Sequence, residues 1–122
     1  MYASATLYQG PNCACCNEYH EWLSDRGVTV EAEVRDDIRD VKSEFGIDED
    51  LWACHTVVYD EYIVEGHMPL DGLLELAEVE PEVDGIALPG MPIGTPGMEG
   101  RKTEDYTVYQ FSDDDIETFT TI

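Results

Sequence analysis

The apolar positions in the first third of the chain switch between two periods, which predicts strands and helices in turn. An apolar run at residues 5–8 stops at Gly10 and Pro11, which indicates a first strand over residues 6–8. From Cys16 the apolar side chains recur at steps of three and four up to Gly27, which predicts a helix of about three turns. Residues 28–34 alternate at period two and predict a second strand with its apolar side chains on one face.

The pattern continues with a second helix, a hairpin and a third helix. Asp36 or Asp37 is expected to cap a short helix closed by Gly46, and residues 47–53 form a turn or short helix. Two apolar runs, 57–59 and 62–64, are separated by two residues and predict a tight antiparallel hairpin. A third helix is expected over residues 70–78, with an inner face made of Leu70, Leu73, Leu74 and Ala77.

The last third of the chain changes in composition. Five of the residues in 85–100 are glycine and three are proline, which predicts a long Gly/Pro/Met-rich loop of functional character. A final strand over residues 106–111 is expected at the edge of the sheet, and residues 113–122 read as an acidic tail. The chain is therefore expected to hold one domain over residues 1–112, followed by a tail over 113–122.

The charge of the chain excludes several classes of partner. Six Lys and Arg face 28 Asp and Glu, for a formal charge of −22. Nucleic acid and anionic membrane surfaces would repel such a chain. The carboxylates are dispersed, which favours a protein from a salt-rich environment, where a Debye length of about 3 Å screens self-repulsion. An ordinary acidic protein is the alternative.

The cysteines are expected to work under reducing conditions. No segment reaches the roughly 20 apolar residues of a membrane span, and no export signal is visible, so the chain as written is expected in the cytoplasm. In that compartment, clustered cysteines more often bind metal or carry out redox chemistry than form structural disulfides.

Three of the four cysteines lie within four positions, directly between the first strand and the first helix. The helix N-terminus favours thiolates, which can attack a disulfide or hold a soft metal. Cys13 and Cys16 are spaced to face the same point, whereas Cys15 would point to the core or to a second copy of the chain. A homodimer that shares metal through Cys15 therefore stays open. The alternative is that some of these thiols are simply buried.

The order of elements, βαβα followed by ββα, resembles the layout of thioredoxins and glutaredoxins. The resemblance implies an α/β, thioredoxin-like fold with a mixed four-stranded sheet and one additional edge strand. In that layout the loop before the hairpin returns over the first helix N-terminus, where those enzymes usually carry a cis-proline. Here the position reads Cys54-His55-Thr56. The sulfur of Cys54, and with it the imidazole of His55, is thus expected to face Cys13 and Cys16.

The remaining candidates extend a soft donor set. His67 and Met68 follow the hairpin, and Met91 and Met98 sit in Gly-rich contexts where they are either soft ligands or apolar plugs. Thiolate, imidazole and thioether donors select Cu(I), zinc or an iron-sulfur centre. The cysteine spacing fits neither iron-sulfur motifs nor paired zinc knuckles, and the methionines favour Cu(I), with zinc as a substitute.

Taken together, these motifs resemble the family known as domain of unknown function 411 (DUF411) over about residues 4–111. The resemblance is carried by residues 13–16, 54–56, 64–69, 88–92 and 94–99. It implies a thioredoxin-like fold and a copper-binding or chaperone-type protein that acts beside copper-exporting ATPases or other copper proteins.

Three functions stay open at this point. The first is a Cu(I) buffer or metallochaperone in copper homeostasis or resistance, with ligands drawn from Cys13, Cys15, Cys16, Cys54, His55 and His67. The second is a thiol-disulfide oxidoreductase in which Cys13 attacks and Cys16 resolves. The third is a structural zinc domain that chelators would unfold. A binding protein is favoured over an enzyme, because the place of the usual proline is taken by Cys54.

Overall fold

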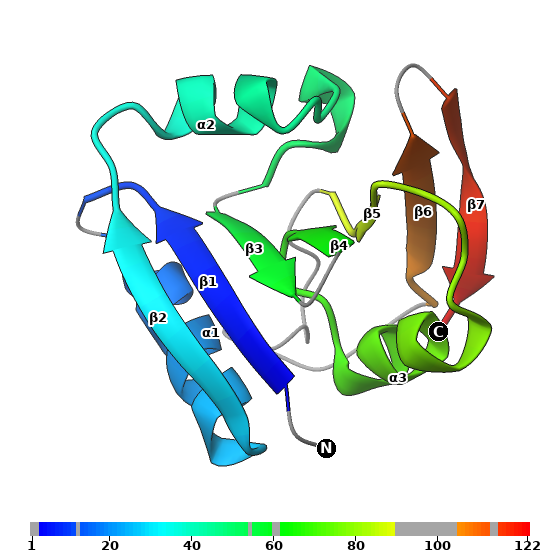
Figure 1. Cartoon of the computed structure of the whole chain (residues 1–122), viewed down its shortest axis with the longest axis horizontal. Helices are drawn as coiled ribbons and strands as arrows, with labels where there is room; N and C mark the ends of the chain where they lie inside the picture. The colour runs from blue at the N-terminus through cyan, green and yellow to red at the C-terminus, as the bar shows by residue number, and fades with distance from the viewer. Residues whose placement is uncertain (1–2, 12, 54, 60–61, 90–104, 113–114) are drawn as a thin grey trace.

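A single mixed sheet of seven strands and three α-helices make up the described part of the chain (Figure 1). The computed structural model describes residues 3–11, 13–53, 55–59, 62–89, 105–112 and 115–122. The strand order is β2-β1-β3-β4-β5-β6-β7. The α/β class is therefore confirmed. The predicted sheet, with four strands and one additional edge strand, has fewer strands than the seven observed.

The first unit is a strand, a helix and a parallel strand, as the pattern predicts. β1 (Ala3–Gln9) pairs in parallel with β2 (Val28–Val34), and α1 (Ala14–Asp25) connects them. Gly27 ends the helix with a φ of 86°, the left-handed conformation that glycine adopts at little cost. β2 is an outer strand, so only its first residue, Val28, is fully buried and Val34 is 58% exposed.

The next elements bring the chain back to the middle of the sheet. α2 (Ile38–Glu44) and the short 3-10 helix η1 (Glu49–Leu51) precede β3 (His55–Tyr59), which pairs antiparallel with β1. β4 (Tyr62–Glu65) pairs antiparallel with β3, and Tyr59 lies opposite Tyr62. The predicted hairpin is confirmed, and its register follows from the two-residue separation.

α3 (Leu70–Val79) forms where the sequence predicts a helix, but it buries a different face. Leu73 and Leu76 are buried together with Gly72, whereas Leu74 is 46% exposed. The reason lies at Gly72, where a Cβ atom would stand 2.5 Å from the Met68 sulfur. Because Gly72 has no side chain, the Met68 side chain can pack directly against the helix. The face of α3 that carries Gly72 is therefore the buried one.

The C-terminal third contributes three strands. β5 (Gly85–Ala87) pairs in parallel with β4, and β6 (Thr107–Ser112) pairs antiparallel with β5. β7 (Asp115–Thr121) pairs antiparallel with β6 and forms the outer strand. The prediction that the last strand over 106–111 lies at the edge was therefore wrong, since residues expected in an acidic tail pair beyond it. Residues 90–104, most of the predicted loop, lie outside the described part.

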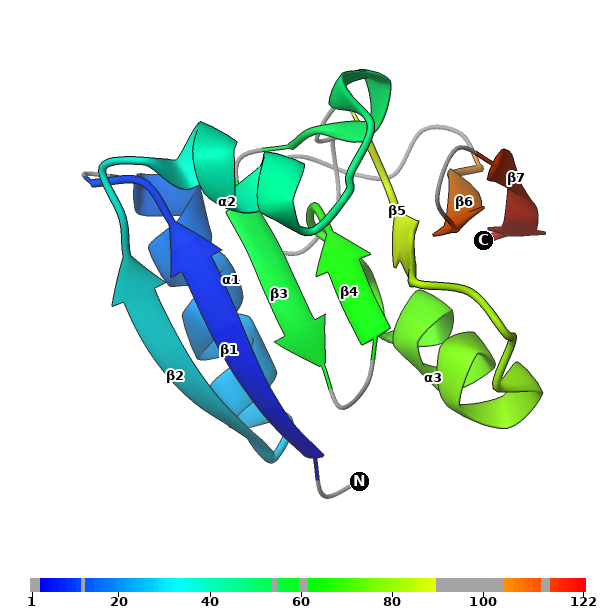
Figure 2. The same cartoon turned by 45° about the horizontal axis from the view of Figure 1, so that its top comes forward.

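The sheet carries side chains on two faces with separate cores. α1 and α3 pack on one face through a cluster that includes Leu7, Leu23, Val57 and Leu73. The segment from α2 to η1 covers the other face, where Leu51 packs with Phe111 in a smaller cluster. Figure 2 shows α1 behind β1 and β2, and α2 in front of the sheet. Among the described residues, no helix is both long and apolar enough to cross a membrane.

The close contact between β4 and β5 gives a test of this topology. A Cβ atom on Gly85 would lie 2.0 Å from the backbone oxygen of Ile63, so Gly85→Ala must push the two strands apart. We expect a loss of about 1 to 3 kcal/mol in the free energy of unfolding, measured by denaturant titration. Gly10→Ala is the matched control, because its Cβ would meet only Ile38, at 3.7 Å. Equal midpoints for the two variants would contradict the β4–β5 pairing.

Candidate metal and thiol site

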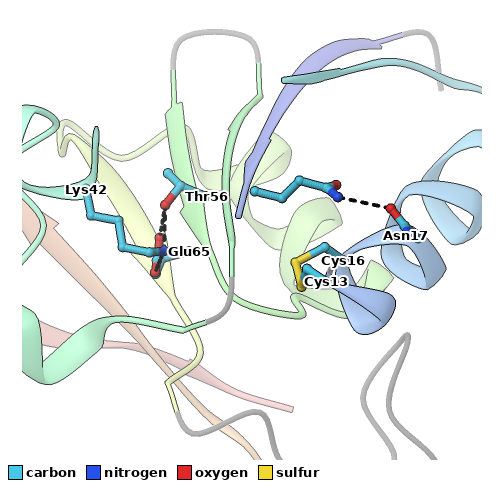
Figure 3. Close-up of a disulfide and its surroundings, with 7 residues drawn as sticks. Cys13, Cys16, Asn17, Lys42, Thr56 and Glu65 are labelled. Atoms are coloured by element: carbon cyan, nitrogen blue, oxygen red, sulfur yellow. Dashed lines mark hydrogen bonds and ion pairs between the residues drawn. A yellow bond between two sulfur atoms is a disulfide. The ribbon is translucent and has the colours of Figure 1, made fainter. Parts of the chain in front are cut away.

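Cys13 and Cys16 meet at the start of α1, as their spacing predicts. Cys13 is the N-cap residue, and the two cysteines form a disulfide with a Cα–Cα distance of 5.3 Å (Figure 3). Cys16 is fully buried and Cys13 is partly exposed. Sulfurs joined in this way are not thiolates, so a metal site at these positions requires reduction to the dithiol.

The end of β1 holds the start of α1 in place. Gln9 is buried, and its amide Nε2 donates a hydrogen bond to Asn17 Oδ1 at 3.0 Å. Gln9 also lies opposite His55 in the β1–β3 pairing. One strand residue therefore ties the cysteine-bearing helix to the strand that carries the first histidine.

His55 and His67 form a buried imidazole pair. His55 is the first residue of β3 and His67 follows β4, and both are fully buried. Their ring centroids lie 4.8 Å apart, and the rings are nearly perpendicular at 73°. Tyr19 of α1 contacts both rings, with centroid distances of 4.8 Å to His55 and 5.4 Å to His67. The pair therefore lies on the α1 face of the sheet.

Tyr19 lies on the helix that carries the cysteines and contacts both histidines. It lies three residues after Cys16 on α1, so the two side chains share the buried face of the helix. Its hydroxyl donates a 2.7 Å hydrogen bond to the backbone oxygen of Met68. Burial raises the pKa of Tyr19 far above its usual range, so the phenol stays protonated and keeps donating. The tyrosine thereby fixes the segment that carries His67.

Gly66 turns the chain so that His67 reaches this face. In a regular strand, residues two apart point to the same side, yet Glu65 and His67 point to opposite sides of the sheet. Gly66 has a φ of 94°, and its N–H donates to the backbone oxygen of His55 at 3.4 Å. A Cβ atom there would lie 2.5 Å from the backbone oxygen of Leu88. Only glycine fits this turn without displacement.

The side chains of several candidate residues lie outside the described part of the structure. Cys54, Met91 and Met98 lie outside the described residues, and of Cys15 only the backbone, in α1, is described. The expected meeting of Cys54 with Cys13 and Cys16 thus stays a prediction. The described residues contain no group of three or more His, Cys, Asp or Glu side chains arranged to hold a metal ion.

The opposite face of β3 and β4 carries a buried polar network that sequence reasoning missed. It joins Lys42 of α2, Thr56 of β3 and Glu65 of β4, all at most 3% exposed. Lys42 Nζ lies 2.5 Å from Glu65 Oε2 and donates to Thr56 Oγ1 at 2.9 Å, and Thr56 donates to Glu65 Oε1 at 2.5 Å. Figure 3 shows this network and the disulfide on opposite sides of the hairpin strands.

Burial raises the pKa of Glu65, and contacts from Lys42, the Ala53 N–H and Thr56 offset part of that rise. A signal for this network was present in the sequence. Lys42 is a rare cation in a chain with six Lys and Arg, and it directly follows an apolar position of the predicted helix. Glu65 likewise is a charged residue that directly follows the apolar residues of a predicted strand.

A surface groove lies away from these residues. A groove of about 890 Å³ runs beside the C-terminal end of α3 and is lined by residues that include Tyr59, Tyr62, Glu80 and Asp84. None of the described residues that line it is a cysteine or a histidine, so its chemistry differs from that of the cysteine and histidine cluster.

Comparisons with known proteins identify the family to which the chain belongs. A family model described as "Protein of unknown function, DUF411" matches residues 51–98. A solved structure described as form 2 of copper resistance protein copG is 32% identical, covers 100% of this chain and 99% of its own, and gives a TM-score of 0.89. The chain belongs to the DUF411 family. Form 1 of copG is 33% identical over 98% of this chain and 96% of its own, with a TM-score of 0.86. No curated protein sequence matches the chain.

The burial of His55 in this DUF411 protein leads to a pH prediction. Burial, followed by the nearby His67 and Lys42, lowers the pKa of His55 well below its usual 6.5. The folded state then binds the proton more weakly than the unfolded state. As the pH falls below about 6.5, the His55 contribution should lower the free energy of unfolding.

NMR titration of the His55 ring in the metal-free protein is the measurement. We expect the ring to stay neutral at a pH where the same ring, in urea-unfolded protein, is half protonated. A midpoint in the folded protein at or above the unfolded one would show that the imidazole is not desolvated as the structure indicates.

Proposed function

We propose that this DUF411 protein acts in copper resistance by binding Cu(I) in its reduced state. The ligands would be the thiolates of Cys13, Cys16 and Cys54, with Cys15, His55 and His67 as adjoining or alternative ligands. The observation that carries the proposal is the buried imidazole pair, which packs against Tyr19 of α1, the helix that begins at the cysteine pair. The two solved relatives described as copper resistance proteins support it.

The donor set fits a soft metal. Thiolate and imidazole ligands favour Cu(I) or zinc over hard cations such as magnesium. A lowered pKa keeps His55 neutral, and the neutral ring is the form that binds metal. Copper(I) is therefore the proposed cargo, with zinc as a substitute.

The proposed role is that of a buffer or metallochaperone rather than an enzyme. Low-coordinate thiolate ligation lets an incoming cysteine displace one ligand at a time, which suits transfer to a copper-exporting ATPase or another copper protein. A homodimer that shares metal through Cys15 belongs to the same proposal. The strand order β2-β1-β3-β4 supports the thioredoxin-like interpretation of the first four strands.

Cu(I) titration of the reduced protein against a competing chelator tests the metal site. A variant with Cys13→Ser, Cys16→Ser and Cys54→Ser should lose affinity by more than the roughly 100-fold that outer-shell changes cost, because it lacks three ligands. His20→Gln, altered on the partly exposed side of α1, is the control and should bind like the wild type. Equal affinity of the triple variant and the wild type would end the copper proposal.

The disulfide favours a second candidate, a thiol-disulfide oxidoreductase. Cys13 is partly exposed at a helix N-terminus and Cys16 is buried behind it. In the reduced protein the Cys13 thiolate would attack a target disulfide and release one target thiolate. The Cys16 thiolate would then attack the Cys13 sulfur, re-forming the disulfide and releasing the second target thiolate. Two electrons pass from the dithiol to the target.

Insulin reduction by the metal-free protein, driven by dithiothreitol, separates the two candidates. We expect no acceleration over dithiothreitol alone, because Cys54, which takes the place of the usual proline, would capture the disulfide and stop turnover. Turnover well above that background and lost in Cys13→Ser would instead assign the protein as the oxidoreductase.

A further inference from the structure

In the buried network on the α2 face, three donors from α2, β3 and the segment before β3 meet at one carboxylate of β4. Glu65 of β4 accepts hydrogen bonds from Lys42 of α2, from Thr56 of β3 and from the backbone N–H of Ala53 at 2.7 Å. The side chain is fully buried, so water does not compete with these donors. The position of Glu65 therefore determines how the segment before β3, the start of β3 and the end of β4 lie relative to one another.

These same positions adjoin both histidines. Thr56 follows His55 directly, and Glu65 precedes His67 by two residues. Thr56 and Glu65 lie opposite each other in the β3–β4 register. Because side chains alternate along a strand, Thr56 and His55 point to opposite faces of the same backbone. A clamp on the α2 face thus fixes the backbone from which the imidazoles project on the α1 face.

Stability alone does not account for such a network. A buried ion pair is weak evidence for stabilisation, because desolvation offsets the attraction, and apolar residues of similar volume often serve as well. Buried hydrogen bonds, however, have strict distances and directions, which apolar packing lacks. Here one carboxylate with three donors constrains two strand ends and the preceding loop at once.

We propose that Lys42, Thr56 and Glu65 are positioning residues for the metal site, and that their network holds the His55 and His67 rings at the separation that metal binding requires. The inference rests on the proposed function for its metal, but the ring geometry can be measured without metal. None of the three side chains would touch the ion. They act through the backbone of β3 and β4.

The sharpest test replaces Thr56, because two small changes separate its hydroxyl from its bulk. Thr56→Val keeps the shape and removes the hydroxyl, whereas Thr56→Ser keeps the hydroxyl. Glu65→Gln removes the charge, and Asp37→Asn, which breaks the exposed 2.8 Å ion pair with Arg35, is the surface control. If Glu65→Gln fails to fold, the Thr56 pair still decides.

The first measurement is made on the metal-free, oxidised protein by NMR. The 4.8 Å separation of the His55 and His67 rings should give cross-peaks between them, and Tyr19 should shift both sets of ring signals. We expect Thr56→Val and Glu65→Gln to weaken the cross-peaks and move the signals. Thr56→Ser and Asp37→Asn should match the wild type.

The second measurement is the Cu(I) affinity of the reduced variants, by chelator competition. Thr56→Val should bind about 10- to 100-fold more weakly, and Thr56→Ser should restore binding. Folded variants with unchanged ring signals would overturn the proposal, as would displaced rings with unchanged affinity. If the reduced wild type binds no Cu(I), the proposed function fails, and the NMR result alone then decides whether the network positions the imidazoles.

Discussion

The alternation of side chains along β3 is the constraint on which the candidate site depends. This strand lies between β1 and β4, so its register is fixed from both sides. His55 points toward α1 and contacts Tyr19, and the next residue, Thr56, points toward α2 and contacts Lys42. A shift of the strand by one residue would exchange these two environments. Burial of both faces makes such a shift costly, and the imidazole pair is correspondingly well defined.

Gly66 is the one place where the regular alternation is interrupted, and the interruption completes the site. The left-handed conformation of Gly66 places His67 on the α1 face of the sheet, whereas Glu65 points to the α2 face. Tyr19 donates a hydrogen bond from its hydroxyl to the backbone oxygen of Met68, stacks on His55 and meets the His67 ring edge-on. The α1 helix therefore contributes more than its cysteines. It supplies the wall against which both imidazoles are packed.

Local patterns in the sequence were sufficient to locate most helices and strands of the first eighty residues and insufficient beyond them. The first two strands, the three helices and the hairpin follow from periodicity, and Gly27 ends α1 as expected. The inner face of α3 could not be predicted, because it depends on Met68 filling the space over Gly72. β5 has three residues and begins with a glycine, so its strand character arises only from pairing with β4 and β6. β7 was not predicted, because its acidic residues made the segment resemble a charged tail.

The site shows the same division between local and long-range information. The spacing of Cys13 and Cys16 predicts their contact, and both histidines were candidates from their loop positions. That the two rings touch, and that Lys42 and Glu65 meet behind them, depends on side chains 12 and 23 residues apart, which no periodic pattern reports. A lysine next to an apolar helix position, in a chain with only six Lys and Arg, was nevertheless an indication of the buried network.

The two outer strands of the sheet have a consequence for how copies of the protein meet. Neighbouring strands in a sheet lie about 4.8 Å apart, and an open edge can recruit another chain into a continuous ribbon. Here one border carries Glu31 and Glu33, and the other carries Asp115 and Glu117. If two such edges paired, carboxylates of the two chains would lie close together, and even molar salt would screen their repulsion only in part. The acidic residues of the two edge strands therefore disfavour the joining of sheets from separate copies.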